Sequence, residues 1–258
     1  MSSTTNWFDL PFVLKSNILS RIGNPEILKD AQKVCKDWYK VCKDPYIWKV
    51  IDLYSLRSSF VGDMAMLREL SKHVVDRSQG QLVDIVIPGL RTGEVLMYVA
   101  DRASQLKRLN MVIGGYGIGD TSIISLPEAL KKFPLLEELR VDFYFLPKEA
   151  IEIAGRYCPL LKTLEFCRAP CMNDNINDEI AMSIGENLHG LRHLKLWNDN
   201  LSDIGLKAIL DGCPHLESLD LSYCDYIDLN GDLVKRASKQ IKHLTLRQKP
   251  ILKKFIMY

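Results

Sequence analysis

Residues 190–224, GLRHLKLWNDNLSDIGLKAILDGCPHLESLDLSYC, contain two phrases of the form L-x-x-L-x-L, which begin at Leu191 and Leu216, 25 residues apart. Variants in which isoleucine, methionine, valine or phenylalanine replaces some leucines begin at five more positions: Leu82, Leu106, Leu136, Leu161 and Ile241. The intervals between the seven starts are 24, 30, 25, 30, 25 and 25 residues. This near-constant spacing predicts a repeated structural unit, because a chance excess of leucine would not preserve it.

Each repeat is predicted to form one strand followed by one helix. The alternation within the phrase is typical of a short strand with one buried face, and Ile204, Ala208 and Ile209 illustrate the helical apolar spacing that follows it. One such unit cannot cover its own apolar face, so neighbouring units must stack and share a core. We therefore predict an α/β fold: a small N-terminal helical domain followed by a leucine-rich-repeat solenoid with one curved parallel sheet and its helices outside.

The repeats resemble a known type. The phrases LxxLxLxxC, LSDIGLKAIL and DGCPHL, between Leu191 and Cys224, are similar to the cysteine-containing leucine-rich repeat, in which the cysteine after the strand lies in a turn. The resemblance is weaker in the second and third repeats, where Gly114 and Tyr144 stand at the cysteine position. Cys158 and Cys213, by contrast, are interpreted as small buried residues.

The first 53 residues do not follow the repeat, and their apolar spacing predicts helices. Leu14, Ile18, Leu19 and Ile22 would share one helical face, and Gly23-Asn24-Pro25 would end that helix. A second helix is predicted within PEILKDAQKVCKDWYKVCKDP, residues 25–45. Its lysines recur at intervals of 4, 3 and 4 residues, which predicts a solvated helix face made of Lys29, Lys33, Lys36 and Lys40.

This N-terminal segment resembles the F-box, a motif that docks on the small adaptor subunit of cullin-RING ubiquitin ligases. The matching residues include Leu10-Pro11 and the run VCKDWYKVCKDPYIWKVIDL, residues 34–53. Phe12-Val13 stands where the family commonly has a glutamate two positions after Leu-Pro. The resemblance implies adaptor contacts from nine residues: Leu10, Pro11, Leu14, Ile18, Leu19, Ile22, Val34, Cys35 and Trp38. Leu10, Pro11, Leu14, Ile18 and Trp38 are expected to be at least partly exposed.

The order of F-box, short linker and cysteine-containing repeats resembles the plant F-box/LRR-repeat proteins over residues 6–247. We predict four regions, which are the F-box at 6–53, a linker helix or irregular first repeat at 54–80, repeats at 81–247 and a tail at 248–258. The tail, which lacks another phrase, is expected to cover the last strand's edge or to fray. The resemblance implies a substrate receptor of an SCF-type ubiquitin ligase that binds an SKP-type adaptor, through it cullin, and an unknown protein substrate.

Strand geometry predicts the substrate-binding face. If the leucines point inward, the residues between them point to the concave surface. The predicted substrate-binding residues are Glu138, Arg140, Asp142, Glu165, His193, Lys195, Trp197, Asp220, His243 and Arg247. Their mixed charges favour a protein or peptide partner over a polyanion. Two interpretations of Trp197 stay open: it is an interface anchor, or it packs over the adjacent turn near Asn198 and Asp199.

Composition excludes several other classes of function. Lysine and arginine total 34 against 32 acidic residues, which offers no general attraction to nucleic acid or to a membrane surface. Neither a signal peptide nor a membrane span is expected. Seven irregularly placed cysteines favour reduced thiols and a location in the cytoplasm or nucleus. The nearest approach to a zinc motif is the pair Cys167 and Cys171, and no metal or cofactor is predicted.

An enzyme is the less favoured alternative. The five histidines fall outside any known catalytic motif, and the glycines of residues 112–120 do not spell a phosphate-binding loop. A second alternative is a leucine-rich-repeat binding module or inhibitor with no link to a ligase. Adaptor binding by the N-terminal segment would distinguish that module from a receptor.

Overall fold

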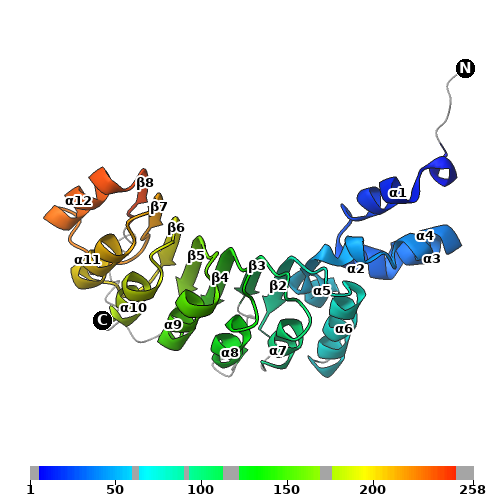
Figure 1. The fold of residues 1–258 in the computed structure, drawn as a ribbon, viewed down its shortest axis with the longest axis horizontal. Coiled ribbons are helices and arrows are strands. Elements are labelled where there is room, and N and C mark those ends of the chain that lie inside the picture. Colours follow the sequence, from blue (N-terminus) through cyan, green and yellow to red (C-terminus); the bar gives the residue numbers. More distant parts are fainter. Residues whose placement is uncertain (1–5, 60–63, 90–92, 113–121, 169–175, 248–258) are drawn as a thin grey trace, which may run out of the picture. The chain divides into compact units, whose positions relative to one another are not determined.

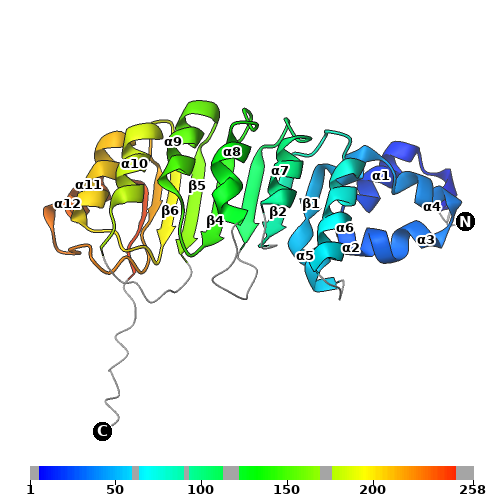
Figure 2. The same cartoon turned by 90° about the horizontal axis from the view of Figure 1, so that it is seen from below.

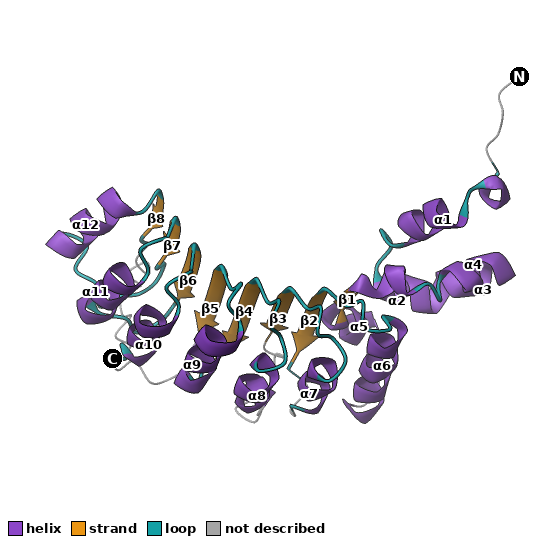
Figure 3. Cartoon of the chain, in the orientation of Figure 1, coloured by secondary structure: helices purple, strands orange, loops and turns teal. Residues whose placement is uncertain are grey.

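The computed structural model describes residues 6–59, 64–89, 93–112, 122–168 and 176–247 (Figure 1). The tail at 248–258, the glycine-rich residues 113–121 and Cys171 lie outside these ranges. The chain forms two compact units, one of Met1–Leu139 with Tyr157–Leu160 and the other of Arg140–Arg156 with Leu161–Tyr258. As predicted, N-terminal helices are followed by an α/β region with a parallel sheet (Figure 3).

The N-terminal segment of the first unit is a series of short helical pieces. They are η1 (Trp7–Asp9), α1 (Phe12–Leu19), α2 (Asn24–Glu26), the π-helical η2 (Ile27–Ala31), α3 (Gln32–Val34), α4 (Lys36–Val41) and the 3-10 helix η3 (Pro45–Lys49). The prediction of one continuous second helix is therefore wrong. Cys35 adopts an extended backbone with φ −163° and ψ 173°, which separates α3 from α4. The four lysines consequently do not share one uninterrupted helix face.

The sheet begins one strand earlier than predicted. β1 (Val50–Asp52), β2 (Asp84–Pro88) and β3 (Arg108–Val112) are parallel, with Ile51 opposite Ile85 and Ile85 opposite Leu109. β1 lies within the residues assigned to the helical domain. The helices that follow these strands are α5 (Leu53–Ser59), α6 (Met64–Arg77), α7 (Glu94–Ala100), η4 (Ser122–Ser125) and α8 (Leu126–Leu130). In Figure 2, α6, α7 and α8 lie on one side of the strands.

The second unit repeats the strand–helix order. β4 (Glu138–Phe143) begins in the last residues of the first unit and is followed by β5 (Thr163–Arg168), β6 (His193–Trp197), β7 (Ser218–Asp220) and β8 (His243–Thr245). Strands β5 to β8 pair in parallel and place Leu164, Leu194, Leu219 and Leu244 in one row. The intervening helices are α9 (Lys148–Tyr157), α10 (Glu179–Asn187), α11 (Asp203–Gly212) and α12 (Asp232–Gln240).

The core lies between strands and helices and is built from the phrase leucines. Leu194, Leu196 and Leu219 are almost fully buried, and burial of each such side chain contributes about 1.5–3 kcal/mol. The turn cysteine Cys224 is buried, and its Sγ donates to the Leu196 carbonyl oxygen at 3.1 Å. Burial raises the pKa of Cys224 to about 12 and that of Cys213 to about 11. These thiols are therefore structural, as expected for buried cysteines.

Candidate functional site: two interaction surfaces

Helix α1 has an inverted distribution of side chains, and this creates the first candidate surface. Phe12, Val13, Leu14 and Ile18 are each 44–67% exposed. Lys15 and Ser16, in contrast, are buried with Leu19 on the opposite face. A helix that stabilised only its own domain would place the apolar residues inward. Exposed apolar side chains gathered on one short helix are typical of a protein interaction site.

Distant carboxylates explain why the polar face of α1 is the buried one. Lys15 Nζ lies 2.9 Å from Asp37 Oδ2, and Ser16 Oγ donates to Asp44 Oδ2 at 2.6 Å. The hydrogen bond from Lys15 lowers the pKa of Asp37, so the carboxylate remains charged opposite the ammonium. A buried charge must be paired to be tolerated. These partners fix the rotation of α1 and so turn its apolar side chains outward.

The N-terminal 3-10 helix is held beside α4 by aromatic and polar contacts. The rings of Trp7 and Trp38 have centroids 4.7 Å apart, and Trp7 Nε1 donates to Asp37 Oδ2 at 3.2 Å. Trp38 nevertheless stays partly exposed. Leu10 and Pro11, which follow the 3-10 helix, are half-buried and exposed respectively. The contacts therefore order the chain just before α1 without covering its apolar side.

The nine predicted docking residues differ in how far they are exposed. Leu10, Pro11, Leu14, Ile18 and Trp38 are partly or largely exposed, as predicted. The other members differ. Val34 is exposed, Ile22 and Cys35 are half-buried, and Leu19 is 0% exposed. Leu19 belongs to the core of the segment in this structure, so its predicted contact with an adaptor stays a prediction that its burial does not support.

Sequence reasoning missed part of this surface. Phe12 and Val13 are among its most exposed apolar side chains, yet neither was in the predicted set. The signal was present in the sequence, because two large apolar residues occupy a position where a glutamate is common in the resembling family. We define the apolar N-terminal surface by the exposed apolar residues of α1, which are Phe12, Val13, Leu14 and Ile18.

The second candidate surface consists of outward-facing strand residues. On β6 the exposed or half-buried His193, Lys195 and Trp197 alternate with the buried Leu194 and Leu196, as the period of two predicts. The same alternation brings out Arg140, Asp142, Glu165 and Asp220 on β4, β5 and β7; His243 on β8 and Arg247 beyond it are exposed as well, but no residue of β8 is buried. We call these nine residues the outward strand face. Glu138, at the start of β4, belongs to the first unit and is half-buried.

Charges of both signs lie on the outward strand face. Arg140 Nη2 lies 3.6 Å from Glu165 Oε1, and such a surface pair contributes little to stability. Burial raises the pKa of Asp142 above its ordinary value. Asp220 Oδ1 accepts hydrogen bonds from Ser222 N and Ser222 Oγ at 2.9 and 2.6 Å. The face therefore offers separate, differently charged positions rather than one field of a single sign.

Trp197 is half-buried and contacts the following repeat. Its ring lies edge-on to Tyr223, with centroids 5.2 Å apart and an interplanar angle of 83°. Asn198 and Tyr223 both adopt positive φ, 58° and 67°, and Asn198 N donates to Ser222 O. The tryptophan thus packs on a neighbouring turn through Tyr223, while part of its surface remains available.

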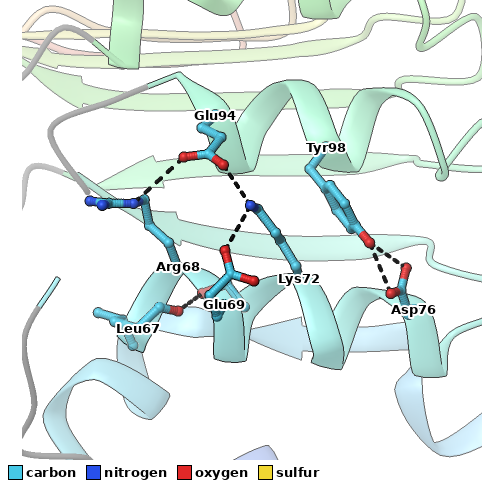
Figure 4. A network of polar contacts seen from close by, with 8 residues as sticks. Leu67, Arg68, Glu69, Lys72, Asp76, Glu94 and Tyr98 are labelled. Carbon is cyan, nitrogen blue, oxygen red and sulfur yellow. Dashed lines mark hydrogen bonds and ion pairs between the residues drawn. The ribbon is translucent and has the colours of Figure 1, made fainter. Parts of the chain in front are cut away.

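A network of polar side chains joins helices α6 and α7. Lys72 Nζ lies 2.8 Å from Glu69 Oε1 and 2.5 Å from Glu94 Oε1, joining α6 to α7 (Figure 4). Tyr98 Oη donates to the carboxylate of Asp76 between the same helices. Lys72 lowers the pKa of Glu94. These contacts tie two helices together and contain no nucleophile paired with a base.

Within the parts of the chain that the structure describes, no three histidine, cysteine or acidic side chains are grouped so that they could hold a metal ion. None of the helices in those same ranges is both long and apolar enough to cross a membrane.

Comparison with known proteins gives matches over most of the chain. A family model described as F-box-like matches residues 7–54. The chain is 45% identical over 243 residues to F-box/LRR-repeat protein 23 of Arabidopsis thaliana, with 93% of this chain and 53% of that protein covered. It therefore spans about half the length of that relative. Identity is 42% to F-box protein SKIP19 and 40% to F-box/LRR-repeat protein 9 of the same organism, covering 77% and 92% of those proteins and 94% and 89% of this chain.

Proposed function

Because the chain belongs to the F-box/LRR-repeat family, whose members generally serve as substrate receptors of SCF-type ubiquitin ligases, we propose that it does the same. Residues 7–54 would bind an SKP-type adaptor and, through it, cullin. The outward strand face, including Trp197, would hold the protein to be ubiquitinated. This chain itself would form and break no covalent bond. We place it in the cytoplasm or the nucleus, where its buried thiols would stay reduced.

The inverted helix α1 is the observation that carries the adaptor assignment. Its apolar side chains are exposed because Lys15 and Ser16 are held inward by Asp37 and Asp44. The buried polar contacts of Lys15 and Ser16 thereby keep the apolar side chains of α1 exposed to water. Such an arrangement is understandable if a partner covers that surface, since burial of the apolar area that is still exposed would then favour binding by about 25 cal/mol per Å² before the costs of association.

Binding of purified SKP-type adaptor to the full chain tests this proposal. The double variant Leu14→Ser, Ile18→Ser should weaken the interaction at least about a hundredfold, because two apolar contacts would be lost. Ile204→Ser is the matched control: Ile204 is 66% exposed and lies in the second unit, so it should bind adaptor as the wild type does. Circular dichroism should be the same for all three proteins.

Two outcomes would count against the assignment. Equal adaptor binding by wild type and double variant would remove α1 from the docking surface. No adaptor binding by the wild type would instead favour a leucine-rich-repeat binding module without a ligase link.

The outward strand face needs a test in cells, because its substrate is unidentified. Proteins enriched with the full chain while the proteasome is blocked should be compared with those enriched by Trp197→Ala. We expect the tryptophan variant to lose captured proteins while retaining the adaptor, since exposed tryptophans are frequent interface anchors. Unchanged capture would restrict Trp197 to packing on Tyr223.

A further inference from the structure

Asp142 is an outward-facing residue of β4 whose carboxylate has no counter-charge. Its side chain is half-buried, between the buried Val141 and Phe143. Burial raises the pKa of Asp142, and no neighbouring cation opposes that shift. Among the described residues, none is hydrogen-bonded to this carboxylate or forms an ion pair with it. Part of its hydration is therefore already lost and has not been replaced, which favours binding of an external cation.

The nearest cations of the outward strand face are matched by other carboxylates. Arg140 Nη2 lies 3.6 Å from Glu165 Oε1. Lys195 on β6 lies opposite Glu165 on β5 and opposite Asp220 on β7, and neighbouring strands are only about 4.8 Å apart. Each of these two cations thus has a carboxylate beside it, and Asp142 is the acidic residue that is left unmatched.

Cys167 separates Asp142 from Trp197 and carries no charge. It lies opposite Trp197 in the paired strands β5 and β6. Burial raises the pKa of the Cys167 thiol, and the Asp142 carboxylate is among the charges that raise it further, so the two side chains lie near each other. The thiol is therefore protonated at neutral pH. An uncharged position is thus flanked by a carboxylate on one side and an indole on the other.

Trp197 can attract a cation on the side that faces β5. Its aromatic neighbour Tyr223, with centroids 5.2 Å apart, follows β7 and so lies on the other side of β6 from Cys167. Arg247, whose carbonyl oxygen accepts from Tyr223 N, lies on that same far side and would repel a second cation there. The face of an indole ring attracts cations more strongly than other aromatic rings do. The attraction of the indole and that of Asp142 therefore act at the same place.

We propose that Asp142 and Trp197 together receive a lysine or arginine side chain of the protein bound to the outward strand face. The carboxylate pairs with the cation, and the indole stacks on it above Cys167. Asp142 would repel an acidic side chain, and an apolar one would leave its carboxylate without a partner. The basic side chain belongs to the substrate, so this assignment rests on the proposed function and names a chemical group that the second unit selects.

Two libraries of short peptides, tested on the immobilised full chain, examine this selectivity. They are the same mixture except that the central residue is arginine in one and citrulline, its uncharged isostere, in the other. The wild type should retain about tenfold more of the arginine library, because citrulline loses both the ion pair and the cation–π contact. Asp142→Asn should reduce this preference to about twofold or less. Glu186→Gln removes the same charge from an exposed position on α10 of the same unit and should keep the preference.

An NMR pH titration of the Asp142 carboxyl gives a readout that a purely structural role would not move. Its pKa should fall when the arginine peptides bind and should not change with citrulline peptides, because a bound cation favours the ionised carboxylate.

The outcomes separate this proposal from the one on which it rests. Equal retention of both libraries by the wild type, or a preference that survives Asp142→Asn, would overturn the cation site alone. Retention of neither library would overturn the cation site and the substrate-binding role of the outward strand face together. Adaptor binding by the same protein is measured independently of all three results.

Discussion

The first and the last strand of the repeat series are closed in different ways. At β1, Ile51 is fully buried and Asn24 pairs with the outer backbone. At β8, Leu244 is only half-buried although the equivalent Leu219 is fully buried, and Ala237 is the one buried residue of α12. No side chain within residues 6–247 that the structure describes is hydrogen-bonded to Leu244.

The N-terminal segment therefore does two things: it covers the outer edge of β1, and it exposes the apolar side chains of α1. Stacked repeats need a cap at each end, because the terminal unit has a neighbour on only one side. The segment that presents the apolar N-terminal surface also supplies Asn24 and so caps the first strand. The proposed docking surface and the closure of β1 are therefore encoded in the same segment of about 50 residues, whereas the described residues at the other end provide no comparable closure.

The largest loss of stability is expected for truncation of Ile51, the buried apolar residue of β1. Ile51→Ala should lower the free energy of unfolding by about 2–5 kcal/mol, because the Ile51 side chain is fully buried and its truncation would leave a cavity. Leu244→Ala at the other end should cost less than half as much, since its side chain is already partly in water. Chemical denaturation of the two variants measures both values. Equal losses would mean that β8 is covered as well as β1.

The repeats could be predicted from sequence because their signal is local. One-sided burial forces an alternation within each phrase, and that alternation placed Leu194, Leu196 and Leu219 in the core correctly. β1 was missed because its sequence, Val50-Ile51-Asp52, lacks the leading leucine of the phrase. Its place in the sheet follows from pairing with residues 84–86, which no local pattern reveals.

The N-terminal segment was harder to predict because contacts between distant residues, rather than a local pattern, fix its conformation. Apolar spacing assigned Leu14, Ile18 and Leu19 to one face, but only Leu19 is buried. The rotation of α1 depends on Asp37 and Asp44, which are 22 and 28 residues from their partners on the helix. The extended Cys35 likewise has no glycine or proline beside it to predict a break.

A smaller effect on stability, which depends on pH, is expected for the pair of Lys15 and Asp37. The pKa of Asp37 is lowered by its hydrogen bond with Lys15, so this contact stabilises the fold above the unfolded-state pKa of about 3.9 and is lost as pH falls through the lower folded value. Asp37→Asn should therefore lower the thermal midpoint at pH 7, and the difference should shrink below about pH 4. In a Lys15→Met background the pH dependence should become weaker, because only the smaller contributions of Trp7 and Lys40 would still lower the pKa of Asp37. A difference that grew on acidification would have the wrong sign for this pair.

The smallest effect is expected for an ion pair on the last helix. Lys235 Nζ lies 2.7 Å from Asp232 Oδ1, but the two side chains are 68% and 96% exposed. Water screens such a pair and side-chain entropy opposes it, so Lys235→Ala should change the free energy of unfolding by no more than about 0.5 kcal/mol. Lys15→Ala is the matched substitution at the capped end. Because the Lys15 side chain is 8% exposed and Asp37 would lose its partner, its thermal midpoint should fall clearly while that of Lys235→Ala stays near the wild type. A larger shift for Lys235→Ala than for Lys15→Ala would reverse the difference between the ends, because α12 would then depend on a surface contact more than α1 depends on a buried one.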